Sequence, residues 1–202
     1  SEVTWTISDI NGVLISGAAP YQGSLCDFSD LTQTCQNLNL SAGWSMFSTY
    51  IETDNMVLSS LFSDLLSNDN LTIVKDYAGA AYLPSFNMDA IGIIENEQGY
   101  LLKTTYAQSI EFCGSYMLPE ANPISLNLGW GIFSYLRLEP ADTEAVFTEF
   151  GADVIIIKNS IGTAYLPDWG FNGIGNLEAG KGYQIKMAAP RTLQYLPNSE
   201  TY

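Results

Sequence analysis

The sequence predicts a mainly β fold of the α+β type, with two tandem β-rich domains of about five strands and one short helix each, preceded by an N-terminal strand extension. Three observations lead to this prediction. A long segment recurs at constant spacing, the recurring segments are rich in β-branched and aromatic residues, and each copy has one short stretch with a helical apolar stripe. The expected boundaries are 1–37 for the extension, 38–117 for the first repeat domain and 124–197 for the second.

The repeat keeps one offset along the chain, since Lys75 and Lys158 are 158 − 75 = 83 positions apart. The same offset relates several pairs of segments: 71–76 and 154–159, 82–84 and 165–167, 91–92 and 174–175, 99–100 and 182–183. A fixed long period without insertions indicates one supersecondary unit copied in tandem.

The extension is expected to carry an assembly strand. Val3, Trp5 and Ile7 alternate with polar residues, which predicts a half-buried strand, and the turn signal Asn11-Gly12 precedes the apolar residues 13–15. Three apolar side chains are too few for a core, but they suit a groove in a neighbouring subunit to which the strand adds. The alternative is that the strand completes the sheet of its own first domain.

The three cysteines, Cys26, Cys35 and Cys113, predict one disulfide. Cys26 and Cys35 enclose 35 − 26 − 1 = 8 polar, loop-like residues, which a disulfide can close, and this pairing leaves Cys113 alone. Such a bond is typical of an oxidising, secreted context, and the alternative is two buried free thiols.

Each repeat is expected to open with an aromatic-rich strand, at 43–50 and at 129–135, and to continue with a short helix. In the first copy Asp54 is the expected N-cap of a helix whose apolar stripe is formed by Leu58, Leu61, Phe62 and Leu65. In the second copy Asp142 is the expected cap and Gly151 the expected end of the helix.

The rest of each repeat is expected to form a β-hairpin and two further strands. The hairpin strands are 71–74 and 81–83 in the first copy and 154–157 and 164–166 in the second. The later strands are 99–103 and 110–112 in the first copy and 182–186 and 193–195 in the second. The stretch 114–125, which contains two prolines, is expected to be a semi-rigid linker between the domains.

The composition excludes several classes of function. Histidine is absent, which removes Ser-His-Asp and Cys-His catalysis and His-containing zinc sites. The net charge of −15, from 22 acidic and 7 basic residues, makes nucleic acid an unfavourable partner, because phosphate binding needs clustered Lys and Arg. No stretch approaches the ~20 apolar residues of a spanning helix, so membrane insertion is not expected.

Acidic residues offer two further hypotheses. Paired carboxylates can perform glycosidase chemistry without histidine, and the candidates are Asp54, Asp64, Glu95, Glu144, Asp168 and Glu178. Calcium suits two oxygen-rich sets, which are Asp64, Asn68, Asp69 and Asn70, and Asp142, Asp153 and Asn159. Solvated acids and Asn/Asp turn chemistry explain these residues more simply, so we expect no catalytic residues and no cofactor.

Aromatic residues recur in step with the repeat. The matching pairs are Trp44 and Trp130, Tyr82 and Tyr165, Phe86 and Trp169, and Tyr100 and Tyr183. Both a sugar-binding platform and a core have this pattern, and recurrence alongside apolar strands favours packing. Asp168, Trp169 and Phe171 lie in a glycine-containing, loop-like segment, and they are the expected ligand patch if the chain binds a ligand.

The second copy carries a pattern in 157–186 that includes Gly162, Tyr165-Leu166-Pro167, Trp169, Phe171-Asn172, Ile174-Gly175 and Gly182-Tyr183-Gln184-Ile185-Lys186. It resembles a repeat of secreted surface proteins from marine Bacteroidetes-type bacteria and of associated viral structural proteins. The first copy departs from the pattern, with Asn87-Met88-Asp89-Ala90 in place of residues 170–173 and Leu101-Leu102 in place of Gln184-Ile185. The resemblance implies display and assembly outside the cell and brings no catalytic residues.

The sequence therefore favours a non-enzymatic, extracellular or cell-surface structural subunit that assembles with copies of itself into a filament or surface layer. A carbohydrate-binding or adhesive module, with surface glycans as partners, is the alternative, and an enzyme is the third choice. Exposed, ordered aromatic residues would favour the module, and a pair of carboxylates in one cleft would favour the enzyme.

Overall fold

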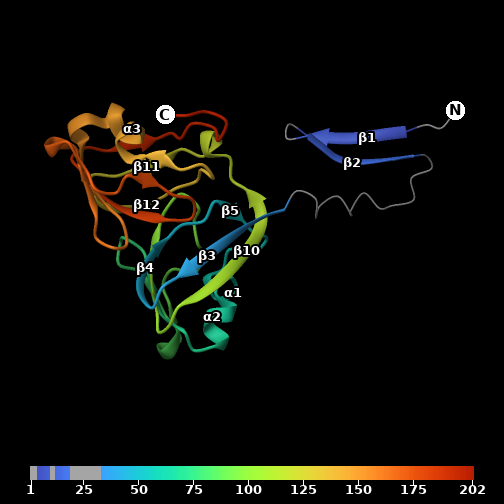
Figure 1. Cartoon of the computed structure of the whole chain (residues 1–202). Coiled ribbons are helices and arrows are strands. Elements are labelled where there is room, and N and C mark those ends of the chain that lie inside the picture. The colour runs from blue at the N-terminus through green and yellow to red at the C-terminus, as the bar shows by residue number, and fades with distance from the viewer. Residues whose placement is uncertain (1–3, 10–11, 19–32) are drawn as a thin grey trace. The chain divides into compact units, whose positions relative to one another are not determined.

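The computed structural model describes residues 4–9, 12–18 and 33–202. The chain divides into two compact units, 1–33 and 34–202. The described part is mainly β, with several antiparallel sheets and a few short helices (Figure 1), as the sequence predicts.

The N-terminal unit contains a two-stranded antiparallel sheet of β1 (Thr4–Asp9) and β2 (Gly12–Ala18). Trp5 lies opposite Gly17 and Ile7 opposite Ile15. The predicted strand at Trp5 and Ile7 is therefore confirmed, whereas Val3 lies outside the described residues.

The first repeat forms a five-stranded antiparallel sheet with the strand order β4-β9-β6-β7-β8. Its strands are β4 (Gly43–Phe47), β6 (Leu71–Lys75), β7 (Ala81–Leu83), β8 (Met88–Asp89) and β9 (Tyr100–Thr104). Two helical turns, α1 (Leu58–Leu61) and α2 (Ser63–Ser67), cover its core. A 3-10 turn at Pro84–Phe86 follows β7, where the proline stops the strand.

The second repeat forms the equivalent sheet, in the order β12-β18-β14-β15-β16. Its strands are β12 (Gly129–Ser134), β14 (Val154–Lys158), β15 (Ala164–Leu166), β16 (Phe171–Asn172) and β18 (Gly182–Met187). Helix α3 (Thr143–Phe147) continues into a 3-10 segment, Thr148–Asp153, and the 3-10 turn Pro167–Trp169 follows β15.

Smaller sheets complete the second unit. Their strands are β3 (Thr34–Leu40), β5 (Ile51–Glu52), β10 (Gln108–Tyr116), β11 (Ile124–Leu126), β13 (Ala141–Asp142), β17 (Asn176–Leu177) and β19 (Arg191–Leu193). They pair as β3-β10-β5, β11-β19 and β13-β17, and a 3-10 turn at Pro119–Ala121 separates β10 from β11. The stretch expected to be a linker thus begins as the end of strand β10, and the compact unit begins at Thr34 rather than at residue 38.

The two repeats share one fold down to single hydrogen bonds. The Tyr100 hydroxyl accepts the Glu95 N–H at 2.9 Å, and the Tyr183 hydroxyl accepts the Glu178 N–H at 2.9 Å. The tyrosine rings stack on Phe47 and Phe133, with centroid distances of 5.6 and 5.7 Å. The strands after each helix carry a register shift at the same place, between Leu71 and Ile73 and between Val154 and Ile156. These matches confirm the duplication.

The helix caps differ between the copies. The Asp142 carboxylate accepts the Ala145 N–H at 3.0 Å and caps α3, as predicted. The prediction that Asp54 caps the first helix is wrong, because α1 begins after Val57 and has no side-chain cap. Asn55, the next residue, makes a side-chain contact in the loop before the helix, where its amide oxygen accepts the Val57 N–H at 3.0 Å. Gly151 does not end α3 but lies at a kink in the following 3-10 segment, with φ of 51°.

The predicted bond between Cys26 and Cys35 is wrong, because Cys35 is bonded to Cys113. Cys35 on β3 and Cys113 on β10 lie directly opposite each other in the antiparallel ladder, with their Cα atoms 4.1 Å apart. Cross-strand neighbours at this separation bring their side chains together without any loop. Glu111 lies beside the two sulfur atoms, but sulfur atoms in a disulfide are not thiolate ligands for a metal.

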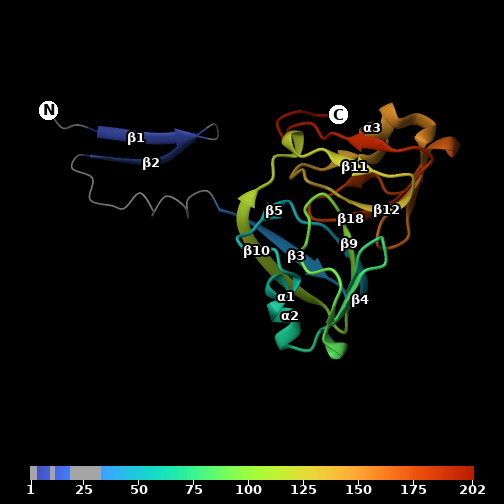
Figure 2. The same cartoon turned by 180° about the vertical axis from the view of Figure 1, so that it is seen from behind.

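Each repeat has a hydrophobic core on the inner face of its sheet, and the two repeats are joined by main-chain contacts. Phe47 bridges to Lys181, and Gln98 bridges to Phe133 in the equivalent way. The Ser48 N–H donates to the Gly180 carbonyl, and the Gly99 N–H donates to the Ile132 carbonyl. In Figure 2, β18 and β12 of the second repeat lie above β9 and β4 of the first. The repeats are therefore parts of one compact unit.

Candidate binding surface

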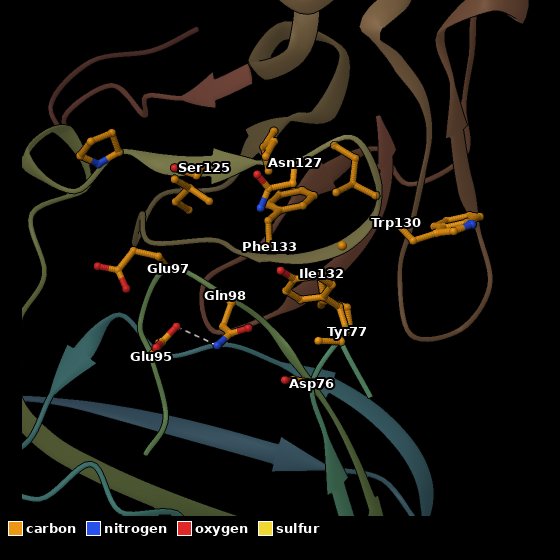
Figure 3. Close-up of a pocket in the computed structure, with 16 residues that line it drawn as sticks. Asp76, Tyr77, Glu95, Glu97, Gln98, Ser125, Asn127, Trp130, Ile132 and Phe133 are labelled. Atoms are coloured by element: carbon orange, nitrogen blue, oxygen red, sulfur yellow. Dashed lines mark hydrogen bonds between the residues drawn. The ribbon is translucent and has the colours of Figure 1, made fainter. Parts of the chain in front are cut away.

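The structure contains a cleft of about 370 Å³ between the two repeats (Figure 3). Three acidic residues of the first repeat, Asp76, Glu95 and Glu97, line it, together with residues 123–127 and 130–133. The Asp76 carboxylate accepts the Gly79 and Ala80 N–H groups at 2.7 and 2.8 Å, and Glu95 accepts a hydrogen bond from Gln98 at 2.9 Å. The carboxylates of Asp76 and Glu95 thus already accept hydrogen bonds from residues of their own loops.

These carboxylates do not converge on one point. Within 33–202, no three acidic side chains bring their oxygen atoms within 4.8 Å of one another. Glu95 and its repeat partner Glu178 lie in different clefts, since Glu178 lines a second pocket of about 210 Å³ in the other copy. The cleft therefore offers scattered hydrogen-bond acceptors rather than a pair of carboxylates that face each other.

The outer face of each sheet carries a row of side chains that crosses the strands. In the second repeat, Trp130 lies opposite Lys186, and Lys186 lies opposite Ile156 on its other side. The register of β14 with β15 places Leu166 next to Ile156, and Leu166 lies opposite Phe171. The row is therefore Trp130-Lys186-Ile156-Leu166-Phe171. Its two ends are open to solvent, because Trp130 is 44% exposed and Phe171 is 53% exposed.

This face is the outer one because the alternate residues of the same strands are buried. Phe133, Ile185, Ile157 and Tyr165 belong to the core of the second repeat. Successive side chains of a strand point to opposite faces, so their neighbours in the row face away from the core. Figure 3 agrees at one position, since the Trp130 ring points away from the other labelled residues of the cleft.

The first repeat carries the same row in equivalent positions. Trp44, which is 49% exposed, lies opposite Lys103, and Lys103 lies opposite Ile73. Leu83 follows on β7 and lies opposite the exposed Met88. The row Trp44-Lys103-Ile73-Leu83-Met88 differs from its counterpart only where methionine replaces phenylalanine at the far end.

Lysine side chains lie over the indole rings. Lys158 and its counterpart Lys75 lie on the same outer faces, two positions along β14 and β6 from the row, and are counted with the rows from here on. Lys186 Nζ is 5.6 Å and Lys158 Nζ is 5.5 Å from the centre of the Trp130 ring, and Lys103 Nζ is 5.9 Å from the centre of the Trp44 ring. Such cation–π contacts are worth about 0.5–1 kcal/mol at exposed sites. They hold each ammonium group beside a flat apolar surface.

The ligand patch expected from the sequence lies at one end of the second row. The 3-10 turn Pro167–Trp169 presents Trp169 with 81% of its surface exposed, and Asp168 is exposed in the same turn. Phe171 follows on β16 and belongs to the row itself. The interpretation of the repeated aromatics as packing holds for Tyr100, Tyr165 and Tyr183, which are buried, but not for Trp44, Trp130, Phe86 and Trp169.

The oxygen-rich sets considered for calcium have other partners. Asn70 is fully buried, and its side chain bonds to Tyr106, Gln108 and the backbone N–H of Thr105. Asn68 donates to the Asp64 carbonyl, and Asp69 has φ of 50° in a turn. In the other set, Asp142 caps α3, Asp153 pairs with Arg191, and Asn159 accepts N–H groups from its own turn. Turn and cap chemistry accounts for each of these contacts.

Sequence reasoning aligned the four lysines of the rows with the repeat but gave them no role. The available signal was the recurrence of all four lysines at the repeat offset, and two of them, Lys103 and Lys186, face a tryptophan across a strand pair. No protein-family model matches the chain, and searches of curated proteins and of solved structures find no match.

Proposed function

We propose that the chain is a non-enzymatic structural subunit that works outside the cell and assembles with copies of itself through its N-terminal hairpin. The observation that carries the proposal is the separate two-stranded sheet β1-β2. A hairpin of two strands is at best marginally stable by itself in water, and its outer edges present unpaired backbone groups. Pairing with a sheet edge of a neighbouring subunit removes both costs.

Three further features support this proposal. The Cys35–Cys113 disulfide is typical of an oxidising compartment outside the cytosol. No helix in the described residues is long and apolar enough to cross a membrane. The resemblance of the repeat to that of secreted surface proteins points to the same setting.

Deleting residues 1–18 tests the proposal. The compact unit 34–202 has its own cores, so the shortened chain is expected to fold, to keep the melting temperature of the full chain and to remain monomeric in analytical ultracentrifugation. The full chain is expected to form polymers that electron microscopy shows. Ile7→Pro, which removes a donor from β1, should also reduce polymers, whereas the control Ile7→Val should not. Undiminished polymers after the deletion, or an unfolded product, would contradict the proposal.

A carbohydrate-binding or adhesive module is the second candidate, and the two outer rows favour it. Flat aromatic rings open to solvent at matching positions of two sheets are the arrangement that sugar rings stack on. Both functions are compatible in one subunit, because the hairpin and the rows use different residues.

A further inference from the structure

The positive charge of this acidic chain is concentrated on the two outer rows. The chain has 7 Lys and Arg residues against 22 acidic ones. Four of the basic residues, Lys75, Lys103, Lys158 and Lys186, lie in equivalent outer-face positions of the two sheets. With so many acids available, this placement is unlike the mixed pattern of an ordinary soluble surface.

These four lysines have no acidic partner in the described part of the chain. The ion pair found within 33–202 joins Arg191 and Asp153, and no carboxylate lies within 4.0 Å of any lysine there. In the second repeat, both Lys158 and Lys186 lie over the same half-exposed indole. Their ammonium groups thus lie beside an indole ring that is open to solvent.

We propose that each outer row binds an acidic polysaccharide, with the lysines pairing with carboxylate or sulfate groups and the aromatic and aliphatic side chains contacting the apolar faces of the sugar rings. This inference rests on the carbohydrate-binding function and names its ligand. The row crosses five strands about 4.8 Å apart, so it is about 19 Å long and suits an extended polymer rather than a small ligand.

The order of aromatic, charged and aliphatic side chains along the row indicates how densely charged a matching ligand is. Trp130 and Phe171 are the exposed ends, and Lys186 lies between Trp130 and Ile156. A polysaccharide with one anionic group for every one or two sugar rings can place an anion at the lysine and apolar ring faces at the aromatic residues. Double-stranded DNA carries one phosphate about every 1.7 Å of its axis, and the net charge of −15 repels so dense a polyanion.

Two rows on one chain also favour a polymeric ligand. The first repeat offers Trp44, Lys103 and Lys75 where the second offers Trp130, Lys186 and Lys158. A second site on the same protein raises the overall affinity for a long chain by increasing the effective concentration. Removing the lysines of one row should therefore weaken binding, and removing those of both should weaken it far more.

The test uses the full chain and three polymers: polygalacturonate, dextran sulfate with no more than one sulfate per ring, and neutral dextran. Binding is measured by affinity gel electrophoresis and by the change in tryptophan fluorescence. The variants are Lys158→Gln/Lys186→Gln, the same pair combined with Lys75→Gln/Lys103→Gln, and the control Lys181→Gln. Lys181 lies outside the rows, so the control changes charge alone. Melting curves by circular dichroism check that each variant is folded.

The full chain is expected to bind at least one anionic polymer, with binding that weakens as salt is added. Each lysine should contribute about three- to five-fold, so the double variant should bind about 10- to 25-fold more weakly and the control should be unchanged. Sulfate and carboxylate ligands are distinguished by which polymer is retained.

Several outcomes would overturn the inference. Equal retention by neutral dextran, unaffected by the lysine changes, would preserve carbohydrate binding but remove the acidic ligand. No retention by any of the three polymers would remove both. If the lysine changes abolish self-association in ultracentrifugation while polymer binding is absent, the anionic partner is the acidic surface of a second copy.

Discussion

Tyr100 and Tyr183 show how single residues hold each repeat together. Both side chains are buried, and each hydroxyl accepts a backbone N–H from the loop that precedes its strand. Burial is the main cause that raises the pKa of each hydroxyl to about 12, because the phenolate would lose its hydration. The two tyrosines therefore stay neutral in the folded chain well above pH 10.

The pKa of these two hydroxyls is higher in the folded chain than in the unfolded chain, and this difference predicts a loss of stability at alkaline pH. Below pH 10 the two tyrosines are neutral in both the folded and the unfolded chain, so they cause no pH dependence. Between about pH 10 and 12 they ionise in the unfolded chain but not in the folded one, which favours unfolding. Urea unfolding at pH 9 and pH 11 should show a lower free energy of unfolding at the higher value.

The double variant Tyr100→Phe/Tyr183→Phe separates the two effects. It should lose about 1 kcal/mol per hydrogen bond at pH 9, because the Glu95 and Glu178 N–H groups lose their acceptors. Its further decline between pH 9 and pH 11 should be smaller than that of the unchanged chain. An equal decline in both would show that other groups cause the pH dependence.

The sequence predicted which aromatic residues correspond, but not which of them are exposed. Trp130 and Phe133 lie three positions apart on one strand, so alternation places them on opposite faces. Both faces contain apolar residues, and the pattern alone does not say which one packs. The structure settles this, since Phe133 contacts Phe147 of α3 while Trp130 lies with lysines.

At the scale of elements, the pairing of β3 with β10 is stabilised by the Cys35–Cys113 disulfide, which spans 78 positions of sequence. Cys35→Ser is expected to lower the free energy of unfolding by about 4 kcal/mol, because a cross-link over so long a loop restricts the unfolded chain strongly. Urea unfolding measures this change. Peptide mapping of the unreduced protein should recover Cys35 and Cys113 in one linked pair of peptides.

The matched control is Cys26→Ser. It should leave both the linked peptides and the unfolding midpoint unchanged, because Cys35 already has its partner. A large loss of stability in this control, or a peptide linking Cys26 to Cys35, would contradict the pairing.

The disulfide also shows where sequence reasoning stops. The short spacing in the sequence suggested that Cys26 pairs with Cys35. The partner of Cys35 in the structure depends instead on the register of two strands that are distant in sequence. The same limit applies to the first helix, where Asp54 has the right residue type for a cap and Asn55 makes the contact. The positions of the longer strands along the chain were predictable, because they follow from periodicity and from the duplication, whereas the order of the strands in each sheet was not predicted.

At the scale of the whole molecule, two glycines allow the repeats to approach each other. A Cβ atom on Gly182 would lie 2.7 Å from the Phe47 carbonyl oxygen, and one on Gly99 would lie 3.0 Å from the Phe133 carbonyl oxygen. Both neighbours are backbone atoms of the other repeat, which cannot move aside as a flexible side chain can. The junction therefore depends on glycine in both copies.

Gly182→Ala is expected to lower the free energy of unfolding by about 1–3 kcal/mol, the usual cost of overpacking, and urea unfolding measures it. Gly131→Ala is the matched control, since its Cβ would lie at an ordinary 3.9 Å from Ile185. The control should have little effect. If both variants lose the same free energy of unfolding, the close approach of the repeats is not the reason that Gly182 is required.

The position of the disulfide has a mechanical consequence for the proposed filament. Cys35 is the second residue of β3 and the second residue of the compact unit, directly after the extension. Thr34, which lies opposite Gly114, is the one residue of β3 that precedes Cys35. Tension applied through the extension therefore reaches a covalent bond before it reaches the rest of this edge strand. The bond passes the load to Cys113 in β10, the central strand of that sheet. As a result, pulling cannot peel β3 away one hydrogen bond at a time.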